Sequence, residues 1–526
     1  MDKQIASYKN FHEFWLDKVS NVGSHVCITD GEDLSRKFTF AQINDYVDRT
    51  AYLLCENGIK KNDRFIVFSE NHPEFFFLYL ASLKLGTLIV PVNPYLLETE
   101  VLSIIDIFKP ILIFADSKRM PLAKKCQDAR KSFIKKSFCL DSDAEDSPRL
   151  INVLSSIGKV NISYNHVTLS DHGSLYCSSG TTGQPKGIPQ SPLNLLTAAK
   201  SLFHAYGFGP HDTQIGILPV YHTALVTYGF WPGVFAGSSF ILCRKFSRQR
   251  FWKDIEGHKA AFVETVPAIL SMLMNPGEDI SKYDLSSLKF IGSGSAPLSL
   301  SLWKNFEAIF NVRISNKYGL SETAPTHFNP PWPVARKMGS IGKALDMCKV
   351  KIVNRNDSEK ECGEIGELVM QGDNVVRGYF EAPEESSTAF RDGWFHSGDL
   401  GYKDADGFFF LVGRRKEIII RGGINIYPIE IDNVLSSHPN VVEAVTFGMP
   451  HKIYGEEVYA AVKLRAETVL DGEELISYCQ KYLAHHKCPK RIFITDKIPR
   501  TPSGKPLRKE LYTLYKSETM EEIRII

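Results

Sequence analysis

Apolar residues along the chain gather in short blocks whose length and borders predict the secondary structure. Residues 75–85 are densely apolar and end at Gly86, which predicts a helix, and residues 88–90 then predict a short buried strand. Residues 267–274 predict a further helix, because a proline suits the first helical position. Further strands are expected at residues 111–115, 260–263 and 288–292. This alternation of strands and helices predicts α/β layers.

Polar and turn-forming stretches divide the chain further. Residues 127–150 are charged and mixed, and we expect them to form a solvated connection. From residue 350 onward short strands alternate with turns, as in residues 363–368, which predicts a β-rich subdomain. After a compact charged break at residues 413–417, apolar strands at 441–445 and 458–462 alternate with helical stretches. These predict a small α+β domain of about a hundred residues, near the commonest domain size.

A chain of 526 residues is too long to fold around one hydrophobic core, so two or more domains are expected. The predicted fold class is α/β, with a large domain of several subdomains over residues 1–413. A small α+β domain is predicted over residues 414–526.

Composition narrows the classes of function. Lys and Arg number 62 against 60 for Asp and Glu, so no basic surplus indicates a nucleic-acid partner. The ten cysteines are scattered without a CxxC pair or a zinc spacing, which is typical of reduced thiols in the cytosol. The most apolar run, residues 225–242, contains Pro232 and three glycines and predicts buried core rather than a membrane span.

Because residues 1–4 carry no apolar signal core, we predict a cytoplasmic protein without a transmembrane segment. Peripheral membrane contact and the oligomeric state stay open.

Residues 176–187 are the most informative stretch for chemistry. They hold five hydroxyl side chains, three glycines and one lysine within twelve residues. Glycine lets the backbone approach a ligand, and N–H groups, hydroxyls and an ammonium together make an anion cradle suited to a polyphosphate. The stretch is not a Walker A loop, because Lys186 precedes Gly187 rather than Ser or Thr. A flexible surface loop is the alternative.

Four further segments follow in order. They are Tyr-Gly-Leu-Ser-Glu-Thr at 318–323, Trp-Phe-His-Ser-Gly-Asp-Leu at 394–400, Gly-Arg-Arg-Lys-Glu at 413–417 with Arg-Gly-Gly at 421–423, and Pro-Arg-Thr-Pro-Ser-Gly-Lys at 499–505. Together with the first stretch they resemble the signature motifs of the ANL adenylating superfamily, and this resemblance covers nearly the whole chain. The superfamily contains acyl-CoA synthetases, non-ribosomal peptide adenylation domains and luciferases.

The resemblance implies a large adenylate-forming domain, a small mobile C-terminal domain and a reaction in two steps. A carboxylate is first transferred to the α-phosphate of ATP, which gives an acyl-adenylate and pyrophosphate. Such an enzyme needs a triphosphate cradle, a divalent metal, an adenosine site and a cation near the developing charge. The implied cradle consists of Ser179, Gly180, Thr181, Thr182, Gly183 and Lys186. For Lys186, an ordinary solvated loop lysine is the alternative.

The second motif implies the metal and adenine contacts. Glu322 corresponds to the Mg²⁺ ligand, and one carboxylate is enough because phosphates and water complete the shell of this ion. Tyr318 and Gly319 correspond to adenine contacts, and Ser321 stands where the family usually has Thr and keeps the hydroxyl. The alternatives are a core tyrosine and a glutamate at a helix N-terminus capped by Ser321.

The remaining motifs imply the ribose, pocket and hinge residues. Asp399 suits the ribose hydroxyls, although a turn aspartate is the alternative, and Arg414 would lie near ribose or phosphate. His222, in a segment similar to the acyl-pocket motif, would help line the carboxylate pocket, with a satisfied core histidine as the alternative. The loop implied to wall this pocket and touch adenine contains Gly294, Ser295 and Ala296.

The C-terminal motifs assign the moving parts. Lys505 would hold the α-phosphate and the substrate carboxylate together, whereas a basic surface tail is the alternative. Lys416 corresponds to the hinge, where many relatives have Asp. Gly422 and Gly423 would face the adenylate when the thiol enters.

The predicted function is therefore ATP-dependent acyl-CoA synthesis, with ATP, Mg²⁺ and coenzyme A as cofactors and a small-molecule carboxylic acid as substrate. Around residues 246–274 the chain resembles the carnitine and medium/long-chain branch. An acyl carrier protein is the alternative thiol acceptor. A luciferase-like oxygenase, an amino-acid adenylating enzyme and a non-enzymatic binding module are weaker alternatives.

Overall fold

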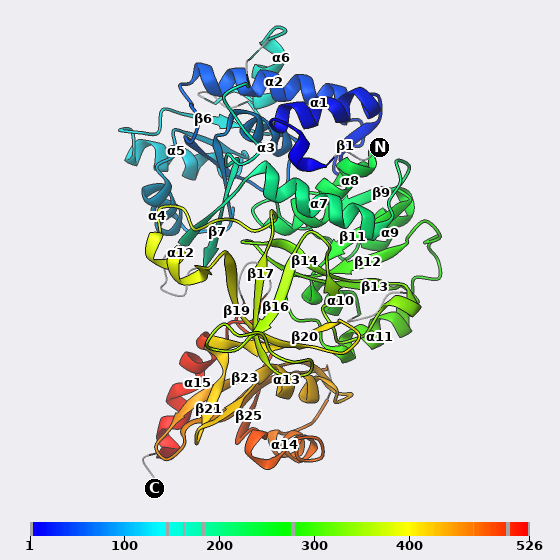
Figure 1. The fold of residues 1–526 in the computed structure, drawn as a ribbon, viewed down its shortest axis with the longest axis vertical. Coiled ribbons are helices and arrows are strands. Elements are labelled where there is room, and N and C mark those ends of the chain that lie inside the picture. The colour runs from blue at the N-terminus through cyan, green and yellow to red at the C-terminus, as the bar shows by residue number, and fades with distance from the viewer. Residues whose placement is uncertain are drawn as a thin grey trace.

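The computed structural model describes residues 4–143, 147–160, 162, 164–179, 185–274, 279–465, 468–500 and 505–523. Two large sheets and their helices form the upper part of the molecule in Figure 1, and the elements from β21 to α15 form its lower end. A third, smaller sheet lies between these two parts.

The first large sheet has nine strands in the order β15-β14-β13-β12-β11-β9-β10-β1-β2. Its strands are β1 Val26–Asp30, β2 Lys37–Thr39, β9 Thr213–Gly216, β10 Ser239–Leu242, β11 Ala260–Thr265, β12 Phe290–Ser293, β13 Ile314–Leu320, β14 Ala324–Asn329 and β15 Lys343–Ala344. The central neighbours from β1 to β13 are parallel, as the βα alternation predicts, and the edge strands β2, β14 and β15 pair antiparallel.

The second large sheet has six strands in the order β6-β5-β3-β4-β7-β8. Its strands are β3 Arg64–Phe68, β4 Leu88–Val92, β5 Leu112–Ala115, β6 Lys136–Cys139, β7 Ser174–Ser179 and β8 Pro185–Gln190. All its pairs are parallel except β7 and β8, which pair antiparallel and flank the central residues of the predicted phosphate loop in the sequence.

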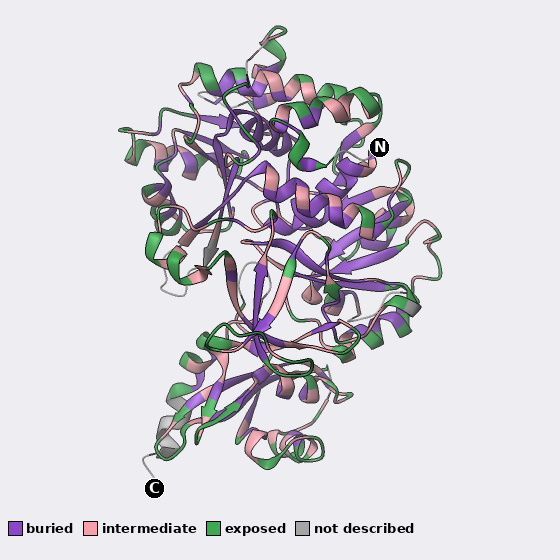
Figure 2. Ribbon diagram, in the orientation of Figure 1, coloured by how far each residue is buried: buried purple, intermediate pink, exposed green. Residues whose placement is uncertain are grey.

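The helix α3, Pro73–Leu85, joins the two large sheets into one core. Every residue of α3 is buried, and the helix contacts β1 of the first sheet and both β4 and β7 of the second. Figure 2 shows this central region as continuous buried ribbon. Gly86 ends the helix with φ +65°, a left-handed conformation that glycine adopts without strain.

The other helices cover the sheets. They are α1 Phe11–Val22, α2 Phe40–Glu56, α4 Glu98–Phe108, α5 Met120–Ala129, α6 Leu150–Ser156, α7 Pro192–Tyr206, α8 Trp231–Ala236, α9 Phe251–Gly257, α10 Pro267–Met274, α11 Leu300–Phe310 and α12 Pro383–Ala389. Short turns of helix occur at η1 Ile5–Ser7, at the π-helix η2 Leu225–Phe230 and at η3 Pro333–Ala335.

The third sheet contains β16 Lys349–Val353, β17 Gly366–Gln371, β18 Phe390–Arg391, β19 Trp394–Lys403 and β20 Phe409–Arg414. The C-terminal unit follows through η4 Arg415–Glu417. It contains β21 Ile419–Arg421, β22 Ile424–Ile426, α13 Pro428–Ser436, β23 Val441–His451, β24 Gly455–Leu464, α14 Gly472–Gln480, η5 His485–Lys487, β25 Arg491–Ile494 and α15 Arg508–Ile523. Its strands enclose hydrophobic clusters of their own.

The apolar run at residues 225–242 and the charged stretch at residues 127–150 compare differently with their predicted structures. Residues 225–242 are buried core, as predicted, and no helix among the described residues is long and apolar enough to cross a membrane. The prediction of a solvated connection at 127–150 is wrong, because β6 extends the six-stranded sheet there. Phe138 and Cys139 of this strand are buried, and the charged residues around them obscured that short apolar signal.

Candidate active site

Three predicted site residues meet at the end of the third sheet. Asp399 on β19 lies directly opposite Arg414 on β20, and the Arg414 Nε donates to Asp399 Oδ1 at 2.7 Å. From β13 of the nine-stranded sheet, the Tyr318 hydroxyl donates to Asp399 Oδ2 at 2.7 Å. Asp399 is only 4% exposed. Since each carboxylate oxygen can accept more than one bond, these partners leave acceptor capacity for a diol.

Tyr318 also has the features of its alternative interpretation as a core tyrosine. It is 8% exposed and packs in the cluster between the first and third sheets, with its hydroxyl at the polar edge. Burial raises the pKa of Tyr318 well above its usual value, so the hydroxyl stays a hydrogen-bond donor. The neighbouring Gly319 has no room for a side chain, because the Ala324 carbonyl lies against its backbone.

Glu322 lies in the tight turn between β13 and β14. No helix starts at this point, so the helix-capping alternative for Ser321 is wrong, and the Ser321 carbonyl instead accepts a bond from Gln190 Nε2 at 2.9 Å. The Tyr379 hydroxyl donates to Glu322 Oε1 at 3.0 Å. Burial raises the pKa of Glu322, because the surrounding groups do not fully replace the water that would stabilise the charged carboxylate. A cation bound beside it would stabilise that charged form.

The surroundings of Glu322 fit a magnesium ion for which the protein supplies one carboxylate and phosphate and water supply the other ligands. Among the described residues no three histidine, cysteine or carboxylate side chains gather as a complete metal site. The carboxylate of the half-buried Glu322 is nevertheless a type of ligand that Mg²⁺ prefers, with phosphate and water completing an octahedral shell.

Tyr379 connects Glu322 to the predicted phosphate loop. The Lys186 Nζ lies 5.3 Å from the Tyr379 ring centroid and 3.8 Å from Glu385 Oε1. Lys186 stands on β8 opposite Ser178 of β7, and both belong to the predicted phosphate-binding stretch. Tyr379 was not predicted from the sequence, because it belongs to no recognisable motif. Its position next to Glu322 arises only when the segment that contains it folds across the site.

The loop residues Gly180, Thr181, Thr182 and Gly183 lie outside the described residues, as does the side chain of Ser179. The neighbouring Gly187 is required by packing, since a Cβ there would overlap Phe108 and Leu175.

Lys505 reaches this cluster from the far end of the chain. It is half-buried and interacts electrostatically with Arg414, Glu417 and Asp399. Burial and then the Arg414 charge hold the pKa of Lys505 below its usual value. The alternative of a basic surface tail does not describe this segment, because Arg508 is also held, by Glu417 at 3.1 Å and Asp432 at 2.6 Å.

The predicted hinge and thiol-side residues lie in the short elements that lead into the C-terminal unit. Lys416 is exposed within the 3₁₀ turn η4, directly after β20. Gly422 and Gly423 form the turn of the β21–β22 hairpin with φ +58° and +83°, and the Gly422 N–H donates to the Tyr454 carbonyl. Both conformations favour glycine.

His222 lines a cavity of about 240 Å³ at the C-terminal ends of β9 and β10. Burial lowers the pKa of His222 to about 4, so the imidazole is neutral near pH 7, and its Nδ1 accepts from the Ala224 N–H at 3.3 Å. Ser295, which has a strained φ of +65°, lines the same cavity and lies between Gly294 and Ala296 in the loop after β12. The sequence-predicted pocket motif and loop therefore meet at one cavity.

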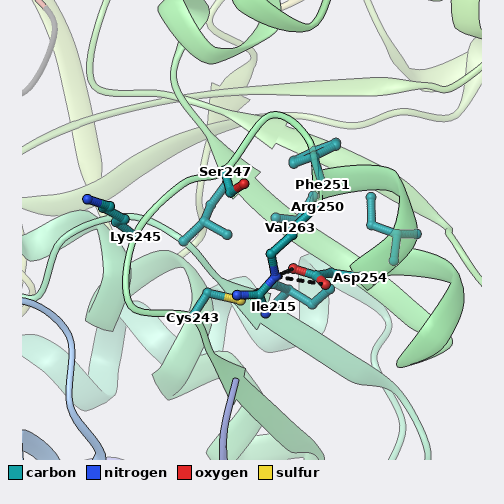
Figure 3. Close-up of a pocket in the computed structure, with 10 residues that line it drawn as sticks. Ile215, Cys243, Lys245, Ser247, Arg250, Phe251, Asp254 and Val263 are labelled. Carbon is teal, nitrogen blue, oxygen red and sulfur yellow. Dashed lines mark hydrogen bonds and ion pairs between the residues drawn. The ribbon is translucent and has the colours of Figure 1, made fainter. Parts of the chain in front are cut away.

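A second, much smaller cavity of about 10 Å³ adjoins the first, and Ile217 and Lys245 line both. Figure 3 shows the Arg250–Asp254 ion pair, 3.4 Å long, inside it, with Cys243 beside the pair and Lys245 pointing away. This interior is filled and ion-paired, so of these two cavities among the described residues the larger is the one able to take a substrate.

The chain is similar to known proteins over nearly its whole length. The family model described as AMP-binding enzyme matches residues 17–380, and that described as AMP-binding enzyme C-terminal domain matches residues 430–505. The chain is 33% identical over 485 residues to an oxalate–CoA ligase of Arabidopsis thaliana, covering 90% of this chain and 93% of the relative.

Two further relatives match 96% of the chain. It is 28% identical over 519 residues to a crotonobetaine/carnitine–CoA ligase of Salmonella typhimurium, covering 96% of this chain and 99% of the relative. Among solved structures it is similar to ATP-bound MatB from Rhodopseudomonas palustris, with a TM-score of 0.87, 27% identity and coverage of 96% and 99%.

Proposed function

The chain belongs to the AMP-binding enzyme family, and from this premise we propose that it activates a small carboxylic acid as an acyl-adenylate and passes the acyl group to coenzyme A. It is an ATP-dependent acid–thiol ligase that uses ATP, Mg²⁺ and CoA. The observation that carries the residue assignment is the convergence of Tyr318, Asp399 and Lys505 from three distant parts of the chain.

In this proposal Asp399 accepts the ribose hydroxyls and Tyr318 fixes the carboxylate that does so. Arg414 holds Asp399 from the other side and presents its remaining guanidinium donors to ribose or phosphate. A carboxylate held from both sides is pre-organised, so little ordering remains when the nucleotide binds.

Glu322 would hold Mg²⁺, and the ion when bound supplies positive charge to the polyphosphate. Tyr379 orients the Glu322 carboxylate and packs beside Lys186. Lys186 would contact the β- and γ-phosphates together with the hairpin loop. His222 and the Gly294–Ala296 loop would place the acid, because both border the larger cavity.

Lys505 would hold the α-phosphate and the acid carboxylate together while charge moves between them. A preorganised cation at such a point stabilises the transition state selectively. The present arrangement, with Lys505 beside Asp399 and Arg414, is therefore the one suited to adenylation.

The second step would follow a rotation of residues 414–526 about Lys416, which brings Gly422 and Gly423 toward the adenylate. The short η4 turn and the separate hydrophobic clusters after residue 418 support a domain boundary at 413/414. Relatives that are CoA ligases support coenzyme A, rather than an acyl carrier protein, as the acceptor.

The test measures both half-reactions on one preparation. The protein is incubated with ATP, Mg²⁺ and a panel of acids, and pyrophosphate release is followed before CoA or a phosphopantetheinylated carrier protein is added. We expect acid-dependent pyrophosphate release and a CoA thioester by mass spectrometry. Thioester on the carrier alone would reject CoA as acceptor, and oxygen uptake with light emission would indicate an oxygenase.

A further inference from the structure

The turn that carries Glu322 is held by hydrogen bonds from outside its own hairpin. Residues 321–323 join β13 to β14, and each of their carbonyl groups accepts a hydrogen bond from a segment distant in the sequence. The three bonds run to the Ser321 carbonyl from Gln190 Nε2 at 2.9 Å, to the Glu322 carbonyl from the Val376 N–H at 2.8 Å, and to the Thr323 carbonyl from Asn374 Nδ2 at 2.7 Å.

The two side-chain donors of this set are buried. Gln190 and Asn374 are each 1% exposed; Gln190 ends β8, and Asn374 lies in the segment after β17. That segment is itself held by Asn194 of α7, whose Nδ2 donates to the Asp373 and Val375 carbonyls at 2.8 and 3.0 Å. Because α7 begins almost directly after β8, one short stretch of chain fixes both donors.

The same strand also carries the predicted phosphate contact. Lys186 and Gln190 lie on one face of β8, because side chains alternate along a strand. Lys186 lies beside the Tyr379 ring, and the Tyr379 hydroxyl donates to the Glu322 carboxylate. Gln190 bonds the carbonyl of the residue before Glu322. Strand β8 therefore reaches Glu322 by two routes, one to its side chain and one to its backbone.

The backbone of the turn requires support from outside. Ala324, which follows the turn, has φ +51°, a left-handed conformation that is unfavourable for alanine. On the opposite strand, the Ala324 carbonyl oxygen lies 2.2 Å from where a Cβ of Gly319 would be, so the two strands are already in close contact. Such a backbone persists only where surrounding contacts fix it. The bonds to residues 321–323 therefore determine where Glu322 lies.

Stability gives little reason for a glutamine at position 190. Gln190 Oε1 is buried and has no hydrogen-bond partner among the described residues. An unpaired buried acceptor commonly costs more than one neutral hydrogen bond contributes. The amide of Gln190 is better explained by the position that it gives to the Ser321 carbonyl.

We propose that Gln190 and Asn374 are positioning residues that hold the Glu322 turn against the phosphate-binding strand β8. The inference rests on the proposed acyl-adenylate chemistry, in which Glu322 holds Mg²⁺ and Lys186 contacts the phosphates. Gln190 and Asn374 act only through the backbone of the turn. Loss of either donor releases the turn and displaces the magnesium ligand, whereas the ribose site at Asp399 stays in place.

The test measures the free Mg²⁺ concentration that half-saturates ATP–pyrophosphate exchange at a fixed ATP concentration, with an acid that the wild-type protein activates. Gln190→Met and Asn374→Leu remove the donors and nearly keep the side-chain size. Each should raise this concentration about tenfold, the lower end of the effect of losing an outer-shell partner of a metal ligand. Excess Mg²⁺ should restore most of the exchange rate.

Gln214→Met is the matched control for the loss of a buried amide. Gln214 on β9 is fully buried and hydrogen-bonded to Ser238 at 3.0 Å, and none of its contacts involves the Glu322 turn among the described residues. This variant should keep the magnesium requirement of the wild-type protein, even where its melting temperature falls.

Calorimetry with an acyl-sulfamoyladenosine separates displacement of the metal ligand from a general loss of structure. This analogue mimics the acyl-adenylate and carries neither polyphosphate nor metal, so the wild-type protein, Gln190→Met and Asn374→Leu should bind it equally. Equal weakening of the analogue and of Mg²⁺ would overturn the proposal. So would an unchanged magnesium requirement in either variant that melts as a folded protein, or a raised requirement in Gln214→Met.

Failure of the proposed function has a different signature. A wild-type protein without Mg²⁺-dependent exchange on any acid of the panel would reject the acyl-adenylate chemistry itself. Normal wild-type exchange together with unchanged variants would reject only the role of Gln190 and Asn374.

Discussion

Replacing Lys505 by alanine should remove most of the first half-reaction and little of the second. In the structure Lys505 is half-buried beside Arg414, Glu417 and Asp399, where burial already makes its charge costly. The negative phosphates of ATP and the acid carboxylate would stabilise the charged ammonium of Lys505 and so offset the cost of its burial. The ammonium would therefore act mainly on the groups whose charge changes during the reaction. Loss of such a contact costs roughly 10²–10³-fold in rate, or about 2.7–4 kcal/mol.

The assay compares ATP–pyrophosphate exchange with thioester formation from a synthetic acyl-adenylate. Lys505→Ala should lose exchange but still form thioester from the supplied adenylate. Lys509→Ala is the matched control, because Lys509 is an exposed lysine in the first turn of α15 and should leave both rates unchanged. Near-normal exchange in Lys505→Ala would refute the role of Lys505 in adenylation.

The pH dependence of ATP–pyrophosphate exchange tests the role of Lys505 in a second way. Because the folded pKa of Lys505 lies below the ordinary value of 10.5, its proton is lost as pH rises through that lowered pKa. The kcat/KM for exchange, which reports the enzyme before its substrates bind, should therefore decline on the alkaline side at a lower pH than an unperturbed lysine would predict. The residual exchange of Lys505→Ala should lack this decline.

Three further substitutions test the rest of the site. Glu322→Gln should raise the Mg²⁺ requirement and slow adenylation on the order of 10²-fold; an unchanged magnesium titration of pyrophosphate release would move the metal site elsewhere. Tyr318→Phe removes a hydrogen bond to the Asp399 carboxylate worth about 1.5–3 kcal/mol, and should raise the KM for ATP without a large change in melting temperature. Lys416→Pro should spare adenylation and slow thioester formation steeply, because residues of a 3₁₀ turn such as η4 typically have φ of about −50 to −70°, near that of proline, whereas rotation of the domain needs another φ. Equal loss of both steps would contradict a hinge at Lys416.

Much of the architecture was predictable because local chemistry and tertiary packing agree. The helix α3 and its end at Gly86 follow from apolar density and one glycine, and the strands β23 and β24 lie at their predicted places. The family was also recognisable from the motif segments, since each has distinctive residue types at fixed spacing.

The strand and the residues that could not be predicted from the sequence depend on contacts between distant segments. The strand β6 is stabilised by its place at the sheet edge against β5, so its own charged neighbours hid it. Tyr379 contacts Glu322 only because a later segment of the chain folds back across the site. Glu264 on β11 and Lys317 on β13 contact each other only because both strands flank Gly292 of β12. No spacing along the chain records such neighbours.

The strand order of the two large sheets has a consequence for synthesis on the ribosome. The six-stranded sheet uses residues 64–190 without interruption and can assemble as soon as they emerge. The strand β1 must instead wait for β10, because Asp30 pairs with Leu242, and α3 is buried completely only when both sheets are present. Phe76 of α3, which packs on Phe230 and Phe240, therefore lacks these partners until residue 240 has been synthesised, so part of this apolar helix stays uncovered during translation.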